Sequence, residues 1–211
     1  SKLLNLTLMK VYEADQIKNI SLLGSAGSGK TTLAEAMLFE GGVISRRGDI
    51  ESKSTISDYH KVEQEYGYSV YSSVLFTEWL GKKINFIDCP GSDDFIGGAI
   101  TSLNVTDTAL LLINATQGVE NGTETMFRYT EQYQKPVILV INQLDHEKAN
   151  YDRCVEEAQE VFGKKAVIVQ YPVNPGSGYN AMVDVLKMKM YVWKPEGGAP
   201  DKIDIPASEK E

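Results

Sequence analysis

The sequence Gly24-Ser25-Ala26-Gly27-Ser28-Gly29-Lys30-Thr31 follows a short apolar run at 20–23 and precedes a helix-like segment at 32–40. Its spacing, G-x-x-x-x-G-K-[ST] between a strand and a helix, is typical of loops that bind a diphosphate. The glycines lack the Cβ atoms that would keep backbone N–H groups away from the phosphates, and the helix N-terminus adds its positive end. Lys30 is expected to reach the β- and γ-phosphates, and the Thr31 hydroxyl to bind Mg²⁺. The alternative interpretation is a tight turn without a ligand.

Composition and charge limit the class of protein. Hydrophobic content of 42% and charged content of 24% are typical of a globular domain with a core. No apolar run approaches the roughly 20 residues of a membrane span, and no signal peptide is recognisable, so we expect a cytoplasmic protein without a membrane partner. A net charge of −8 disfavours binding to a DNA or RNA backbone, and we expect a monomer without a DNA partner. Cys89 and Cys154 match no disulfide or metal pattern and are expected to be reduced core residues.

Apolar runs alternate with helical patterns along the chain. Strands are expected at 19–23, 69–80, 83–88, 109–113 and 137–141, and helices at 32–40, 92–103, 122–133 and 150–162. This order predicts an α/β fold, in which helices flank a mostly parallel sheet and ligands bind at the carboxyl ends of the strands. Gly24, Asp88 and Asn142 each follow a strand end, so all three are expected to face one crevice. Asn121 or Thr123 is expected to cap the helix at 122–133.

Three segments fall outside this alternation. Residues 42–67 are polar without a sustained period, which indicates a mobile functional loop or, alternatively, a plain surface loop. Beyond residue 163, β-like runs at 166–170 and 183–193 flank a turn-rich stretch at 172–178, and the polar residues 194–211 would not fold alone. We therefore assign 9–163 to a core domain and 164–211 to a second unit. Residues 1–8 precede a candidate start at Met9 and are expected to lie outside the natural chain.

Two further motifs extend the predicted phosphate site. Asp88-Cys89-Pro90-Gly91 lies at a strand end, where the aspartate can hold Mg²⁺ through water and the Gly91 N–H can sense a γ-phosphate. Asn142-Gln143-Leu144-Asp145 follows another strand end, and the Asp145 carboxylate offers two acceptors to the N1–H and exocyclic amine of guanine. Adenine cannot present that pair, so the motif predicts GTP or GDP rather than ATP. Two alternatives stay open: Asn142 caps the following helix, or the chain is a P-loop ATPase or kinase.

With these residues in place, the chain resembles the GTP-binding domain of translational GTPases, specifically that of elongation factor G. The resemblance runs from about Lys18 to Trp193 and includes Thr32, which follows the phosphate-binding lysine and threonine. Asp58 with Glu63-Gln64-Glu65-x-Gly67 is similar to the end of the first switch of that family, and residues 86–95 are similar to its second switch. Residues 170–173 and 184–189 resemble the start of the insert that elongation factor G carries. The resemblance implies a P-loop NTPase fold, GTP or GDP with Mg²⁺ as ligands, and the ribosome as the partner of the full-length factor.

The chain departs from the family pattern at four places. Tyr66-Gly67-Tyr68-Ser69 replaces Arg-Gly-Ile-Thr, and Ser69 keeps the hydroxyl that the family uses as an Mg²⁺ ligand. Gln143 replaces a lysine whose stem packs on the guanine. Ser92 replaces the histidine that positions the attacking water. The last guanine-contact motif is expected beyond Glu211, so 164–211 is expected to be a truncated beginning of the inserted subdomain and nucleotide affinity is expected to be poor.

The resemblance also assigns roles to the site residues. The implied catalytic positions are Lys30, Gly91 and an inactive Ser92, and the implied Mg²⁺ ligands are Thr31, Ser69 and Asp88. The expected function is a GTPase domain whose two switches change conformation with the γ-phosphate for ribosome association and translocation, with slow or absent hydrolysis. The alternative is a ribosome-binding protein that depends on GTP occupancy and does not hydrolyse it.

Overall fold

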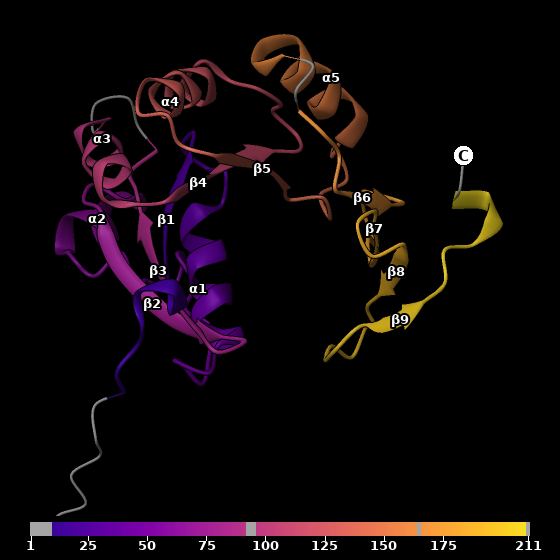
Figure 1. Cartoon of the computed structure of the whole chain (residues 1–211), viewed down its shortest axis with the longest axis horizontal. Coiled ribbons are helices and arrows are strands. Elements are labelled where there is room, and N and C mark those ends of the chain that lie inside the picture. The colour runs from indigo at the N-terminus through magenta and orange to yellow at the C-terminus, as the bar shows by residue number, and fades with distance from the viewer. Residues whose placement is uncertain (1–9, 92–95, 164–165, 210–211) are drawn as a thin grey trace, which may run out of the picture.

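The computed structural model describes residues 10–91, 96–163 and 166–209. These residues form a five-stranded sheet and a four-stranded sheet (Figure 1). The larger sheet has the strand order β2-β3-β1-β4-β5. Its parallel strands are β1 (Ile17–Gly24), β3 (Lys82–Asp88), β4 (Thr108–Asn114) and β5 (Val137–Asn142), and its antiparallel edge strand is β2 (Ser73–Trp79). The predicted α/β fold with a mostly parallel sheet is therefore confirmed.

Helices cover both faces of the larger sheet (Figure 1). One face carries α1 (Lys30–Glu40), and the other carries α3 (Ile96–Val105), α4 (Asn121–Gln132) and α5 (Tyr151–Phe162). In β1, the neighbouring residues Leu22 and Leu23 point to opposite faces, and both are fully buried. A strand that is covered on both sides needs such a continuous apolar run, because successive side chains alternate between the faces.

Local hydrogen bonds explain where some elements differ from the prediction. The helix α1 begins at Lys30, earlier than predicted, with Gly29 in the left-handed conformation at the N-cap. The strand β2 begins at Ser73, later than predicted, because the N–H groups of Val70 and Tyr71 donate to the Glu63 carboxylate at 3.0 Å. The described part of α3 begins at Ile96, since residues 92–95 lie outside the described residues.

The predicted cap of α4 was wrong. Its N-cap is Glu120, which makes no side-chain capping bond, and Asn121 is already the first helical residue. The Thr123 hydroxyl instead lies 2.9 Å from the Ser25 hydroxyl. The start of α4 is thereby linked to the glycine-rich loop, a contact that helix-capping rules do not consider.

The segment 42–67 contains packed structure, so the expectation of a loop without a packed element was wrong. The helix α2 (Lys61–Tyr66) lies within it, and the buried carboxylates of Glu35 and Glu63 hold the surrounding backbone. Glu35 of α1 accepts hydrogen bonds from the N–H groups of Gly48, at 2.8 Å, and of Ile56. These contacts join residues that are distant in sequence, so hydrophobic periodicity does not reveal them.

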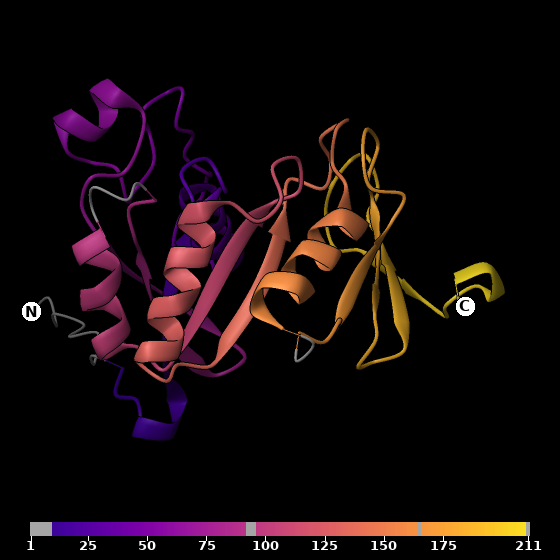
Figure 2. The ribbon, with the colours of Figure 1, turned by 90° about the horizontal axis from the view of Figure 1, so that it is seen from above.

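The smaller sheet is antiparallel and has the order β6-β7-β8-β9. Its strands are β6 (Gln170–Val173), β7 (Ala181–Asp184), β8 (Lys189–Val192) and β9 (Asp201–Ile203). It lies beyond β5 and α5 (Figures 1 and 2), and the Tyr151 hydroxyl of α5 donates to the Gln170 carbonyl at 3.0 Å. Its core consists of Val173, Ala181, Val183, Met190 and Ile205.

Three details of the smaller sheet differ from the prediction. The β-like run expected at 166–170 becomes a strand only from Gln170. Pro172, expected in a turn, lies in β6, an edge strand in which proline is tolerated. The run at 183–193 is two strands, because the Lys187 N–H donates to Asp184 Oδ1 at 2.9 Å in an intervening turn.

Short 3₁₀ helices, η1 (Ala14–Gln16) and η3 (Ala207–Glu209), lie near the ends of the described chain. Within the described ranges, none of the helices is long and apolar enough to cross a membrane.

Candidate functional site

The glycine-rich loop connects β1 to α1 and comes into close contact with two other strand ends. Gly24 has a φ of 139°, and a Cβ atom there would lie 2.5 Å from the Leu112 carbonyl oxygen of β4. Gly29 has a φ of 91°, and a Cβ atom there would lie 2.3 Å from Nδ2 of Asn142 at the end of β5. Both positions therefore require glycine for conformation and for space. The loop therefore lies against β4 and the end of β5, and its contact with Asn142 brings two of the three residues expected at the crevice to one edge of the sheet.

Lys30 is the first residue of α1, directly after this loop, and it is almost fully buried. Its Nζ donates to the carbonyl oxygens of Gly24 and Ser25, both at 2.8 Å. Burial lowers the pKa of Lys30, and the negative charge of Asp88 opposes that effect. A Cβ atom on Gly91 would lie 2.5 Å from this Nζ. The structure therefore brings Gly91 of the second predicted motif directly against the lysine of the first.

The predicted Mg²⁺ ligands Thr31, Ser69 and Asp88 also come together. Thr31 Oγ1 donates to Asp88 Oδ2 at 2.9 Å and lies 3.2 Å from Ser69 Oγ. Among the described residues, Asp88 Oδ1 is buried and has no hydrogen-bond partner. Burial raises the pKa of Asp88 to about 6, although the bond from Thr31 and the charge of Lys30 act in the opposite direction.

A carboxylate with an unpaired buried oxygen, beside two hydroxyls, fits a hard cation such as Mg²⁺. No group of three or more His, Cys, Asp or Glu side chains arranged to hold a metal occurs in the described part of the chain. The side chains that could bind the ion are the Asp88 carboxylate and the hydroxyls of Thr31 and Ser69. They lie next to the glycine-rich loop, where the phosphates are predicted to bind.

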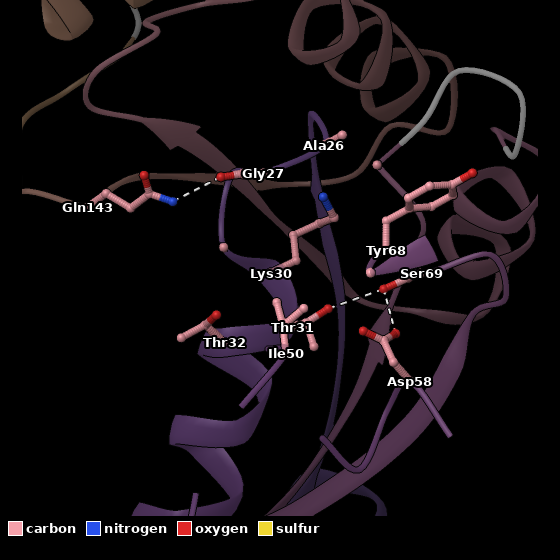
Figure 3. A pocket seen from close by; sticks show the side chains of 13 residues that line it. Ala26, Gly27, Lys30, Thr31, Thr32, Ile50, Asp58, Tyr68, Ser69 and Gln143 are labelled. Atoms are coloured by element: carbon pink, nitrogen blue, oxygen red, sulfur yellow. Dashed lines mark hydrogen bonds between the residues drawn. The ribbon is translucent and has the colours of Figure 1, made fainter. Parts of the chain in front are cut away.

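Residues 58–69, which are predicted to form the end of the first switch, are called the first-switch segment below. This segment reaches the candidate metal position through Ser69. The Ser69 hydroxyl donates to Asp58 Oδ1 at 2.7 Å, and burial raises the pKa of Asp58 while that hydrogen bond lowers it. A cavity of about 460 Å³ lies between the glycine-rich loop and this segment. Figure 3 shows its walls, which include Ala26, Gly27, Lys30, Thr31, Thr32, Ile50, Asp58, Tyr68, Ser69 and Gln143.

The motif after β5 contacts the glycine-rich loop from the other side. The Asn142 side chain donates to the Ser28 carbonyl and the Gln143 side chain donates to the Gly27 carbonyl, both at 2.9 Å. Asn142 does not cap the following helix, because the N-cap of α5 is Asn150. The capping alternative for Asn142 is therefore wrong. Asp145 is exposed at the end of the motif.

A second cavity, of about 440 Å³, adjoins this motif. Gln143 lines both cavities, so the two are neighbours. The walls of the second cavity are Ile141, Asn142, Gln143, Leu144, Asp145, Tyr179, Asn180 and Trp193. The sequence did not predict the last three as site residues: Tyr179 and Asn180 precede β7 and Trp193 follows β8 of the smaller sheet, and no motif spacing in the sequence points to them.

The structure does not place the side chains of two predicted site residues, Cys89 and Ser92, at the site. Cys89 is fully buried, its thiol lies 3.2 Å from the Ser102 hydroxyl, and burial raises its pKa to about 11. Its side chain belongs to the core beneath α3, so any nucleotide contact at this position is through the backbone. Ser92 lies outside the described residues. Its predicted role as the replacement of a catalytic histidine stays a prediction.

The mostly parallel sheet and the glycine-rich loop between its strand β1 and helix α1 define a P-loop nucleotide-binding domain. The sequence model of the elongation factor Tu GTP-binding domain matches residues 15–193. The chain belongs to this family of GTP-binding domains, as a divergent member that is similar to elongation factor G.

Individual relatives agree with this placement. The chain is 35% identical over 192 residues to an elongation factor G-like protein of Thermotoga maritima, covering 91% of this chain and 27% of that protein. It is 32% identical over 200 residues to elongation factor G of Rhodopseudomonas palustris, covering 94% of this chain and 29% of that protein. A crystal structure of a protein from Thermus thermophilus superposes with a TM-score of 0.86 at 30% identity, covering 92% of this chain and 29% of that one. The chain thus spans less than a third of the length of these relatives.

Proposed function

We propose that this chain binds Mg²⁺-GTP and GDP and changes the conformation of its first and second switches according to which nucleotide is bound. The observation that carries the proposal is the position of Ser69. Its hydroxyl lies 3.2 Å from that of Thr31, at the start of α1, and donates to Asp58 in the first-switch segment. A ligand that alters the surroundings of Thr31 would therefore also affect Ser69. Through the hydrogen bond from Ser69 to Asp58, the change would reach the rest of the first-switch segment.

Thr31, Ser69 and Asp88 would hold the Mg²⁺ ion. The ion supplies neutralisation of the phosphate charges when it is bound. Lys30 would exchange its two carbonyl partners for phosphate oxygens, and the Gly91 N–H would approach the γ-phosphate. These contacts exist for GTP and are reduced for GDP, which gives the differential stabilisation that a switch needs.

Glu63 would extend the change along the chain. Its carboxylate accepts hydrogen bonds from the N–H groups of Val70 and Tyr71, the two residues that directly follow Ser69. Displacement of Ser69 would strain these bonds and move the end of α2 relative to β2. The surface that contains the exposed Tyr59, Tyr66 and Tyr71 would move with it.

The full-length protein would present this surface to the ribosome in the cytoplasm, by analogy with the named relatives, and 164–211 would begin an inserted subdomain. Hydrolysis would be slow or absent, because Ser92 stands where the family uses a histidine. The same substitution favours the second candidate function, a GTP-dependent ribosome-binding protein that does not hydrolyse its ligand. Single-turnover GTP hydrolysis by the full-length protein with ribosomes distinguishes the two: measurable acceleration supports the slow GTPase, and its absence supports the binding protein.

Nucleotide competition tests the proposed function itself. A fluorescent GDP analogue bound to the chain in the presence of Mg²⁺ should be displaced by GTP and GDP and not by ATP at the same concentration. Hydrogen exchange at residues 58–71 should be slower with a non-hydrolysable GTP analogue than with GDP. Displacement by ATP as effective as that by GTP would contradict the assignment of the base, and identical exchange in both states would contradict the switch.

A further inference from the structure

The smaller sheet contacts the predicted guanine motif directly. The loop between β6 and β7 lies at the same edge of the molecule as the loop that follows β5 (Figure 2). The N–H of Gly176 donates to the Leu144 carbonyl at 2.7 Å, and Gly176 is buried although Asn174, Pro175 and Ser177 around it are exposed. The loop is therefore anchored on the motif that contains Asp145.

This anchoring places two aromatic residues opposite the motif. Tyr179 and Trp193 line the 440 Å³ cavity together with Gln143 and Asp145. The backbone N–H of Trp193 donates to the Asn180 carbonyl at 2.8 Å, and the Asn180 side chain donates back to the Trp193 carbonyl at 3.2 Å. These two bonds join the residue before β7 to the residue after β8, so they hold Trp193 at the end of the smaller sheet.

Tyr179 is also close enough to Asp145 to respond to its charge. Burial raises the pKa of Tyr179, and the Asp145 carboxylate raises it further. Tyr179 is half-buried and lines the cavity, so part of this residue is available to a ligand. The Gln143 side chain already has a partner, because its amide donates a hydrogen bond to the Gly27 carbonyl in the glycine-rich loop.

A guanine base is a flat aromatic surface, and it binds well where one edge meets a carboxylate and one face meets an aromatic ring. The cavity offers both. We propose that the smaller sheet completes the base site, with Tyr179 as the aromatic wall for a guanine base held by Asp145 and with Trp193 beside it. This inference rests on the proposed function, because it assumes that Asp145 receives the base.

The proposed contact between Tyr179 and the base can be tested by comparing the affinity for GDP with the affinity for Mg²⁺-tripolyphosphate. Tripolyphosphate carries the phosphates without a base, so it reports on the glycine-rich loop alone. In the 211-residue chain, Tyr179→Ala should weaken GDP binding by about tenfold to 100-fold and leave tripolyphosphate binding unchanged. Tyr179→Phe should bind GDP nearly as the unmodified chain does. Tyr191→Ala, in β8 of the same sheet and outside the cavity wall, is the matched control and should have no effect.

Tryptophan fluorescence gives a second readout that does not depend on a Tyr179 variant. The chain has two tryptophans, so Trp79→Phe leaves Trp193 as the single reporter. GDP should quench its emission and tripolyphosphate should not. Unchanged GDP affinity in a folded Tyr179→Ala, or an unresponsive Trp193 in a chain that binds GDP, would overturn the inference and leave the proposed function standing. Failure of the unmodified chain to bind GDP at all would overturn the proposed function instead.

Discussion

The phosphate end and the base end of the candidate site are built in different ways. The phosphate end is made by the glycine-rich loop, the end of β3 and the first-switch segment, and its central side chains, Lys30, Thr31 and Asp88, are all buried. At the base end, Asp145 is exposed, and Tyr179, Asn180 and Trp193 in the same cavity lie directly beside strands of a second sheet. The phosphate end is thus a property of the core, whereas the base end depends on how two sheets are placed against each other.

The difference indicates how each end should respond to substitution. Buried charges whose hydrogen bonds are shared cannot be changed without affecting their neighbours. An exposed carboxylate beside an open cavity can be changed with little effect on folding. Variants at the base end should therefore alter ligand preference, and variants at the phosphate end should alter metal dependence, hydrolysis or local order.

The largest effect is expected from Ser92→His in the full-length protein. A group that orients the attacking water typically contributes on the order of 10²–10⁴ to the rate, so ribosome-stimulated hydrolysis should rise by about that factor. The measurement is multiple-turnover phosphate release with ribosomes, and Ser92→Ala is the control that should remain slow. An unmodified protein that already matches the rate of Ser92→His would show that another residue orients the water.

Next in size is Asp145→Asn at the base end. The substituted amide presents a donor where the carboxylate presented an acceptor, so GTP affinity should fall by about 100-fold while xanthosine triphosphate binds better than before. Competition titrations with both nucleotides measure the preference. Asp152→Asn, in the first turn of α5, is a control with the same change of charge. Equal base preference before and after the change at Asp145 would remove this residue from the base site.

A smaller and more selective effect is expected from Thr31→Ala. Loss of the hydroxyl removes one proposed Mg²⁺ ligand and the hydrogen bond to Asp88, so Mg²⁺-GTP binding should weaken about tenfold more than Mg²⁺-free GDP binding. Thr31→Ser keeps the hydroxyl and should retain the metal dependence. Calorimetry with and without Mg²⁺ compares the two ligands, and equal losses for both would leave the hydroxyl with a structural role only.

The smallest effect on nucleotide binding is expected from Glu63→Ala, because this substitution loosens the backbone of the first-switch segment and removes no ligand contact. The change leaves the N–H groups of Val70 and Tyr71 without their acceptor, and their hydrogen exchange should accelerate about tenfold in the absence of nucleotide. Glu65→Ala removes an exposed carboxylate from the same helix and serves as the control. If both variants exchange alike, the buried carboxylate does not hold the switch.

The order of strands and helices was predictable because it depends on patterns within short windows. The apolar run of β1 and the glycine-rich loop after it are contiguous, so their structure follows from local rules. The helix α2 was not predicted, because its six residues carry no long periodic pattern and Glu63 anchors it through backbone groups outside the helix. The cap of α4 was missed for a similar reason, since Thr123 bonds to Ser25 rather than to its own helix.

The sequence by itself determined the phosphate-binding loop, the expectation of a guanine nucleotide and the family resemblance. Each rests on residue types at fixed short spacings, where the chemistry requires a glycine, a lysine or a carboxylate at one position. Only the tertiary structure decided that Gly91 lies against Lys30, that Ser69 meets Thr31, and that Tyr179 faces the Asp145 motif. The physical reason is that these contacts depend on how elements pack across long stretches of chain, and no local spacing records that packing.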